Sequence, residues 1–433
     1  MVGQAAHHEL PFKIAMKIPS PSFGKICSPS GEFPSSFKVG ISKSVPRSVG
    51  GFTFRFMMPR FLLSLLAASF CPFAHAVDHV ALLGTYTGGE SRGIYAVRLN
   101  SETGELSKPE LVAELSNPEF LALHPNGRYV YALTQVPGAD RKSSGAVAAF
   151  AVEPDSGRLT LLNVEATGRG SLTHLAVDAT GKMIVAASYG GAYVVSFPLA
   201  EDGKVGKRAS LIPHTGPLGP NHARQDAPHP HSVTLSPDNR FAFVADLGQD
   251  RMFAYRLSPA QGSIVPHEPA FATMEPGAGP RHSKFSPDGK SFYILDELDG
   301  TLTSCRYDAK RGVVEPFQRI STLPEDFKGK NTTSEVRIHP SGRFVYAANR
   351  GHDSLAVFSR DGETGALTRV EIVPCGGENP RNFALSPDGA WLLCAHQTSD
   401  NLSVFRVDPN AGRLAITPHG AHVPKAVCVL FLR

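Results

Sequence analysis

The chain has 433 residues, 42% of them hydrophobic, and its formal net charge at pH 7 is +4. The positive charge comes from the first 76 residues, which hold 8 of the 43 basic and 2 of the 39 acidic residues; the other 357 carry 35 basic against 37 acidic residues. A segment of that length can bury a large core, and its charge balance lacks the basic surplus typical of nucleic-acid binding. We therefore expect one large domain and no nucleic-acid partner.

The N-terminal residues predict a leader. Residues 57–76 resemble a secretory signal, with an arginine, a ten-residue apolar run too short to span a bilayer, and an Ala-His-Ala cleavage site. Residues 1–56, rich in Ser, Pro and Lys, show no strand pattern. We interpret them as a non-structural extension, as sequence before a true start at residue 57 or 58, or as an organelle-type presequence. The expected product is exported, with its domain over residues 77–433 and no membrane partner after signal removal.

One short turn recurs along the rest of the chain, with β-rich runs on both sides of each copy. The six copies are His124-Pro125-Asn126-Gly127-Arg128, Asp178-Ala179-Thr180-Gly181-Lys182, Ser236-Pro237-Asp238-Asn239-Arg240, Ser286-Pro287-Asp288-Gly289-Lys290, His339-Pro340-Ser341-Gly342-Arg343 and Ser386-Pro387-Asp388-Gly389-Ala390. Their second positions lie 54, 58, 50, 53 and 47 residues apart. Such spacing is typical of a propeller in which each repeat is one four-stranded blade.

A second turn ending in glycine alternates with the first and occurs seven times, at Gly104, Gly157, Gly203, Gly262, Gly312, Gly365 and Gly412. The glycine turn thus occurs once more than the first turn. This difference is explained if strands at residues 80–86 and 426–432 share one blade. The sequence therefore predicts an all-β fold, a seven-bladed β-propeller closed by pairing of its N- and C-terminal strands. Such closure leaves no open sheet edge.

Two sets of positions should meet at one rim of the central channel. In each repeat the strand before the first turn should be innermost, and a hairpin brings its start to the same rim as the end of the next strand. Six residues before the turn's second position stand Glu119, Thr173, His231, Arg281, Ser334 and Arg381; ten residues after it stand Gln135, Tyr189, Leu247, Glu297, Arg350 and Gln397. These residues differ between repeats and concentrate charge. They predict a ligand site, with solvated loop-edge charges as the alternative.

Four of these positions carry candidate chemistry. His231 follows prolines that restrict its backbone, and a neutral imidazole there can take a proton from water; a structural histidine bonded to a loop carbonyl is the alternative. Arg281 and Arg350 suit a phosphate, a carboxylate or a developing oxyanion. Glu297 would lie between the arginines, either in catalysis or in a neutralising salt bridge. No third ligand stands at metal-binding spacing near His231, so we expect no metal and no cofactor.

The ordered motifs also resemble a known family. They are Gly84-Thr85-Tyr86-Thr87, Pro228-His229-Pro230-His231-Ser232, Asp246-Leu247-Gly248-Gln249-Asp250-Arg251, Gly279-Pro280-Arg281-His282, Asp296-Glu297-Leu298 and Asn349-Arg350-Gly351-His352-Asp353. Together they are similar to those of the seven-bladed lactonase family, which contains the propeller-type 6-phosphogluconolactonases and the 3-carboxy-cis,cis-muconate lactonising enzymes. The resemblance covers residues 78–433 and implies that His231, Arg281, Glu297 and Arg350 are catalytic. As substrate-binding residues we name His229, Arg381, Tyr189, Gln135, Asp246 and His282.

The resulting hypothesis is hydrolysis of a small anionic sugar lactone, with or without a phosphate, by a monomer. His231, assisted by Glu297, would deprotonate a water that attacks the ring carbonyl. One of the two arginines would stabilise the oxyanion and the other would hold the anionic group of the substrate. Two alternatives stay open: a 3-carboxy-cis,cis-muconate cyclase with the same groups, and a non-catalytic exported propeller that binds a ligand or a protein.

Overall fold

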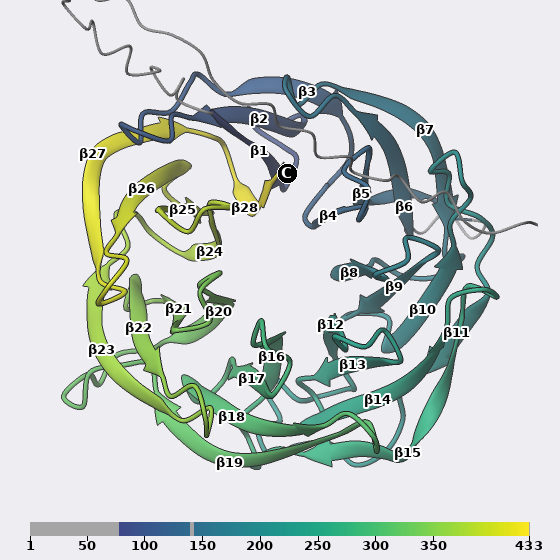
Figure 1. The fold of residues 1–433 in the computed structure, drawn as a ribbon. Coiled ribbons are helices and arrows are strands. Elements are labelled where there is room, and N and C mark those ends of the chain that lie inside the picture. Colours follow the sequence, from purple (N-terminus) through teal and green to yellow (C-terminus); the bar gives the residue numbers. More distant parts are fainter. Residues whose placement is uncertain (1–77, 139–142, 433) are drawn as a thin grey trace, which may run out of the picture. The chain divides into compact units, whose positions relative to one another are not determined.

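The fold is a closed ring of antiparallel β-sheets. The computed structural model describes residues 78–138 and 143–432, in which 28 strands form seven four-stranded sheets around a central channel (Figure 1). The predicted all-β, seven-bladed propeller is therefore confirmed. The predicted signal at residues 57–76 and the extension over residues 1–56 lie outside the described residues. Within the described residues we find no helix long and apolar enough to cross a membrane.

The blades are numbered in chain order, and the strands of each blade are given from the innermost to the outermost. Blade 1 contains β28 (Ala426–Phe431), β1 (His79–Thr85), β2 (Gly93–Leu99) and β3 (Glu110–Glu114); blade 2 contains β4 (Leu121–Leu123), β5 (Tyr129–Pro137), β6 (Ser143–Val152) and β7 (Leu159–Ala166). Blade 3 contains β8 (His174–Val177), β9 (Met183–Ser188), β10 (Tyr193–Pro198) and β11 (Ser210–Pro213); blade 4 contains β12 (Pro230–Leu235), β13 (Phe241–Asp246), β14 (Arg251–Ser258) and β15 (Ser263–Thr273).

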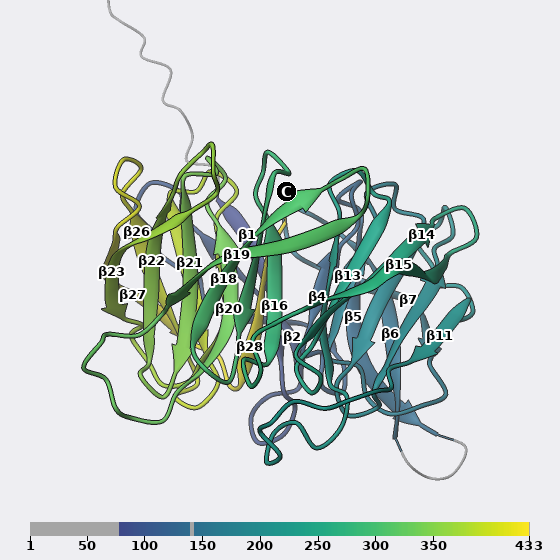
Figure 2. The same cartoon turned by 90° about the horizontal axis from the view of Figure 1, so that it is seen from below.

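The remaining three blades follow the same order. Blade 5 contains β16 (Pro280–Phe285), β17 (Ser291–Asp296), β18 (Thr301–Asp308) and β19 (Val313–Ser321). Blade 6 contains β20 (Thr332–Ile338), β21 (Phe344–Arg350), β22 (Ser354–Arg360) and β23 (Leu367–Pro374), and blade 7 contains β24 (Pro380–Leu385), β25 (Trp391–His396), β26 (Asn401–Val407) and β27 (Leu414–His422). Seen from the side, inner strands such as β16 and β20 run along the channel axis, whereas outer strands such as β15 and β19 are inclined to it (Figure 2).

Blade 1 closes the ring with strands from both ends of the domain. The C-terminal strand β28 is innermost and pairs antiparallel with β1, where Ala81 lies opposite Phe431 and Leu83 opposite Val429. The predicted sharing of one blade by the two ends is therefore confirmed. The pairing of β28 with β1 therefore holds the two ends of the domain together within one sheet.

Neighbouring blades pack through apolar side chains on their facing surfaces. Between blades 4 and 5, for example, Phe243 of β13 and Phe292 of β17 are buried with ring centroids 5.4 Å apart. The cysteines of the described residues, Cys305, Cys375, Cys394 and Cys428, are buried free thiols. Buried apolar side chains of the described residues form six clusters, which together involve strands of all seven blades.

The recurring glycine of the second turn locks each blade to the preceding one. Gly203 of blade 3 has a positive φ of 81°, and a Cβ added there would lie 2.4 Å from a ring carbon of Tyr129 in blade 2. Its carbonyl also accepts a 3.0 Å hydrogen bond from the hydroxyl of Tyr131. Gly412 of blade 7 repeats the arrangement against Phe344 and Tyr346 of blade 6. At these two positions the turn thus requires glycine for both its backbone conformation and the close approach of an aromatic ring.

Candidate active site

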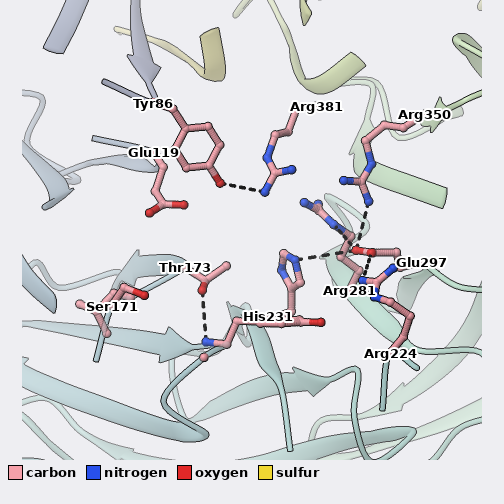
Figure 3. Close-up of a pocket in the computed structure, with 13 residues that line it drawn as sticks. Tyr86, Glu119, Ser171, Thr173, Arg224, His231, Arg281, Glu297, Arg350 and Arg381 are labelled. Atoms are coloured by element: carbon pink, nitrogen blue, oxygen red, sulfur yellow. Dashed lines mark hydrogen bonds and ion pairs between the residues drawn. The ribbon is translucent and has the colours of Figure 1, made fainter. Parts of the chain in front are cut away.

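Three residues at the mouth of the channel stand on β-bulges of the innermost strands. In β12 the pairing passes from Pro230 opposite Asp246 to Ser232 opposite Ala245, which leaves His231 without a partner residue. The same irregularity recurs in β16 and β24. The three residues skipped in this way are His231, Arg281 and Arg381, and each follows a proline. A bulge redirects a side chain out of the regular strand alternation, so these three side chains turn into the channel (Figure 3).

These side chains surround a pocket of about 360 Å³. Its wall consists of Tyr86, Glu119, Ser171, Leu172, Thr173, Tyr189, Gly190, Arg224, His231, Arg281, Glu297, Arg350 and Arg381. The two predicted sets of rim positions contribute eight of these thirteen residues. Such a volume falls within the range of pockets that hold small molecules. The four residues predicted to be catalytic therefore lie together at one end of the channel.

Glu297, the first residue after β17, is the centre of the charge network. Its Oε1 lies 2.5 Å from Nη2 of Arg224, and its Oε2 lies 2.9 Å from Nε of Arg281 and 3.2 Å from Nη2 of Arg350. Burial raises the pKa of Glu297, but the charges of Arg350 and Arg281 outweigh burial and hold this pKa well below its usual range. Glu297 is therefore a permanent carboxylate that partly neutralises three guanidinium groups.

His231 is a buried neutral imidazole beside this carboxylate. Its Nε2 lies 3.9 Å from Oε2 of Glu297, and the side chain is 7% exposed. Burial, with smaller contributions from Arg281 and His282, lowers the pKa of His231 well below its usual range. Its Nδ1 has no hydrogen-bond partner among the described residues. A neutral imidazole can accept a proton, and the nearby carboxylate would stabilise the imidazolium that results.

The two arginines beside Glu297 differ in how fully their donors are used. Arg281 is 3% exposed and donates from Nε to Glu297 and from Nη1 to the carbonyl of Ser334. Arg350 donates from Nη2 to the carbonyl of Thr333 at 2.7 Å, while its Nε has no partner among the described residues. The unpaired Nε of Arg350 is itself buried, but the side chain is 14% exposed against 3% for Arg281, so Arg350 is the more accessible of the two from the pocket.

Tyr86 and Glu119 lie on the side of the pocket opposite Glu297, and Arg381 lies between Tyr86 and Arg350 (Figure 3). Nη2 of Arg381 donates a 2.9 Å hydrogen bond to the hydroxyl oxygen of Tyr86, and its guanidinium carbon lies 5.3 Å from the centroid of the Tyr86 ring. Burial raises the pKa of Glu119, although the Tyr86 hydroxyl and the charge of Arg381 act in the other direction. This wall therefore presents a positive group, a hydroxyl and a carboxyl that ionises less readily than usual.

The other predicted substrate-binding residues lie in different places. Tyr189 lines the pocket and stacks on His229 with ring centroids 4.1 Å apart. Among the described residues, His229 and Asp246 are not part of the pocket wall. Asp246 accepts hydrogen bonds from the backbone N of His229 at 2.8 Å and from Nδ1 of His214 at 2.6 Å. These two residues support the pocket from behind instead of facing a ligand.

Gln135 and His282 also lie outside the wall as the structure describes it. Gln135 is an interior residue of β5, opposite Gly145, because this strand continues to Pro137 and does not end at the rim like its counterparts. His282 lines a smaller cavity of about 20 Å³ next to the pocket, and its ring centroid lies 5.3 Å from that of His231. His282 therefore lies behind the proposed base.

The comparison with known proteins identifies the family. A family model described as lactonase, 7-bladed beta-propeller, matches residues 80–431. The chain belongs to this lactonase family. Among its relatives, the 6-phosphogluconolactonase of Bacillus subtilis is 36% identical over 354 residues, which cover 82% of this chain and 98% of the relative. The 6-phosphogluconolactonase of Formosa agariphila is 31% identical over 341 residues, 78% of this chain and 94% of the relative.

Solved structures agree with this assignment. The periplasmic gluconolactonase of Pseudomonas aeruginosa is 32% identical, with a TM-score of 0.77 over 82% of this chain and 99% of that chain. A protein from Lactobacillus plantarum is 30% identical, with a TM-score of 0.76 over 82% of this chain and 100% of that chain. The protein is thus a lactone hydrolase by family. Among its described residues, no group of three His, Cys, Asp or Glu side chains is arranged to hold a metal ion.

Seven of the thirteen wall residues were not among the predicted site residues, and three of these seven, Tyr86, Glu119 and Arg224, have ionisable side chains. Tyr86 stood in a quoted motif and Glu119 in a predicted rim set, so the sequence offered a signal for both. Arg224 offered none, because it lies in the long connection between β11 and β12, outside the repeat pattern. That connection is anchored by Gln225, whose Nε2 donates to the carbonyl of Leu247 at 2.9 Å and to Asp250 at 2.8 Å. The anchor places the neighbouring Arg224 over Glu297.

Proposed function

We propose that this lactonase hydrolyses a sugar δ-lactone of the 6-phosphogluconolactonase type to its acid without a metal ion. The observation that carries the proposal is the neutral, buried His231 with Nε2 3.9 Å from the permanently ionised Glu297. The names of the relatives from Bacillus subtilis and Formosa agariphila support the substrate class. A pocket of about 360 Å³ is large enough for a six-carbon lactone.

In the proposed first step, Nε2 of His231 takes a proton from a water molecule, and the resulting hydroxide bonds to the lactone carbonyl carbon. Glu297 stays ionised and stabilises the imidazolium by its charge, because its pKa is too low for it to take the proton itself. This role is more specific than the assistance expected from the sequence. General-base catalysis of this kind typically contributes about 10² to 10⁴ in rate.

In the proposed second step, the tetrahedral intermediate expels the ring oxygen. Arg350, whose side chain is more exposed than that of Arg281, stabilises the negative charge on the former carbonyl oxygen, while Arg281 keeps Glu297 in position. Cleavage of the carbon–oxygen bond leaves an alkoxide, which takes the proton back from His231. The product is the open-chain hydroxy acid, and the base returns to its neutral form.

We also propose that the enzyme acts outside the cytoplasm. The signal-like residues 57–76 support this, as does the relative from Pseudomonas aeruginosa, whose name places it in the periplasm. Cell fractionation of a tagged full chain, with a cytoplasmic marker beside it, tests this part of the proposal.

The proposed hydrolysis is tested by acid release in a pH-stat from glucono-δ-lactone and its 6-phosphate. We expect His231→Ala to lower kcat by about 10² to 10⁴. The matched control is His422→Ala, since the His422 side chain is 65% exposed and on the outermost strand β27, and it should keep the full rate. A His231→Ala enzyme with more than half of the normal rate would overturn the assignment of the base. Loss of the ultraviolet absorption of 3-carboxy-cis,cis-muconate, without lactone hydrolysis, would instead indicate the cyclase.

A further inference from the structure

Three of the four arginines in the pocket share one carboxylate, and the fourth does not. Arg224, Arg281 and Arg350 each have a nitrogen within 3.2 Å of an oxygen of Glu297. Arg381 has no carboxylate oxygen within 4.0 Å among the residues that the structure describes. An uncompensated guanidinium facing a pocket attracts an anion, because binding an anion restores the charge balance.

The side chain of Arg381 is held in place while most of its donors stay available. Its hydrogen bond to Tyr86 fixes one nitrogen at 2.9 Å, and the ring of the same tyrosine lies 5.3 Å from the guanidinium carbon. The bulge at the start of β24 directs the stem into the channel. A guanidinium has five N–H donors in a planar fork, so the remaining ones can bind two oxygens of a phosphate or carboxylate.

Arg381 lies beside the proposed chemistry in the same pocket. Figure 3 shows Tyr86 and Glu119 on the side of the pocket opposite Glu297, with Arg381 between Tyr86 and Arg350 and its guanidinium above His231. Besides burial, the charge of Arg381 also contributes to the lowered pKa of His231. A six-carbon lactone with its charge on the last carbon would therefore place its charged end at Arg381 and Tyr86 and its carbonyl carbon near His231 within one pocket.

We propose that Arg381, supported by Tyr86 and Glu119, is the subsite for a terminal phosphate or carboxylate of the lactone, and that it sets the preference for charged over neutral substrates. This inference rests on the proposed function, because it assigns one end of the same substrate. Tyr86 contributes its hydroxyl and orients the guanidinium. Glu119, when protonated, donates to an oxygen of the anion, and burial favours this neutral form.

The decisive experiment compares Arg381→Met with Arg406→Met. Arg406 is also on blade 7 and also stacks on an aromatic ring, with its guanidinium carbon 4.5 Å from the Trp391 ring centroid, but it is exposed and outside the pocket. The substrates are glucono-δ-lactone, its 6-phosphate, and the 1,5-lactone of glucaric acid, which carries a carboxylate on the last carbon. We expect Arg381→Met to lower kcat/KM for the charged lactones by about 10- to 100-fold more than for the neutral one, because a hydrogen bond to a charged group is lost. The loss should appear as a higher KM.

The two charged lactones show whether the subsite prefers a phosphate or a carboxylate. The preferred group is the one whose lactone loses more kcat/KM in Arg381→Met. Equal losses on all three lactones would overturn the subsite, because Arg381 would then serve the part that they share. Arg406→Met should leave all three ratios unchanged.

A binding measurement separates this inference from the proposed function. Titration calorimetry with 6-phosphogluconate and with gluconate needs no turnover, and the wild type should bind the phosphorylated acid about 10- to 100-fold more tightly. The advantage should disappear in Arg381→Met. Retention of the advantage in the variant would overturn the subsite. A third outcome is that Arg381→Met loses the advantage while the wild type hydrolyses none of the three lactones. This outcome would support the anion subsite and overturn only the proposed hydrolysis.

Discussion

Replacing Glu297 by glutamine tests the charge network most directly, because it keeps the shape and removes the charge. Its carboxylate oxygens lie within 4 Å of nitrogens of three arginines and of His231, and the side chain is 5% exposed. Removing one member of a buried ion pair typically costs about 3–5 kcal/mol, because the partner charges stay buried without compensation. For a domain of about 350 residues such a loss lowers Tm by roughly 5 °C.

The pH dependence of this contribution follows from the depressed pKa of Glu297. Because the folded-state pKa lies below the ordinary value of 4.5, the stabilisation is fully present above the unfolded pKa and is lost as the pH falls through the folded one. The Tm difference between wild type and Glu297→Gln should therefore be constant from pH 6 to 8 and should shrink progressively as the pH falls below about 4.5. The activity should also fall by about 10² to 10³, since the charge that stabilises the imidazolium is gone.

Calorimetric melting and the pH-stat assay on the same preparations check both effects. Glu153→Gln is the control, because Glu153 is 64% exposed and lies 3.8 Å from Arg158 on the surface. An exposed pair of this kind is worth less than about 1 kcal/mol, so its Tm should stay within about 1 °C of the wild type. A Glu297→Gln enzyme that melts with the wild type and hydrolyses lactone at the normal rate would refute the central role of this carboxylate.

Two further predictions concern the base and the blade junctions. Because the pKa of His231 is far below its usual range, kcat/KM should show no acid limb between pH 6 and 7.5, and a limb centred near 6.5 would contradict a buried neutral base. Gly203→Ala should destabilise the fold by about 2–5 kcal/mol in urea, through left-handed strain and the contact with Tyr129. The control is Gly127→Ala, because Gly127 has a similar φ of 72° and no atom within 4 Å of the added Cβ. This substitution should lower the free energy of unfolding by only about 1–2 kcal/mol. Equal losses of stability in the two variants would show that the contact with the Tyr129 ring is unimportant.

The arrangement of the blades was predictable because each repeat carries its own local signal. A proline or glycine turn between two strands fixes a hairpin wherever it occurs, and seven glycine turns against six of the other kind located the shared blade. The rim positions followed from the same register. The prediction placed His231, Arg281, Glu297 and Arg350 on one rim, and all four line one pocket. The turn signals of the single repeats and the closure of the ring lead to the same arrangement, so counting residues from each turn was enough to place these four side chains.

The exceptions appear where a residue's position depends on something other than the repeat. Gln135 was counted to the rim, but β5 is longer than its counterparts and keeps this residue inside the ladder. Arg224 reaches Glu297 from a connection whose path is set by the tertiary contacts of Gln225, and no periodic signal describes such a path.

The effect of the β-bulges after the prolines also could not be predicted from the repeat alone. The pattern of a proline followed by a polar residue was visible, but the redirection of the side chain depends on the pairing with the neighbouring strand. The repeat therefore determines where the site is, whereas its charge balance depends on the irregular elements. Arg224 supplies the third cation on Glu297 from one such element, and the bulge in β24 turns Arg381 into the channel.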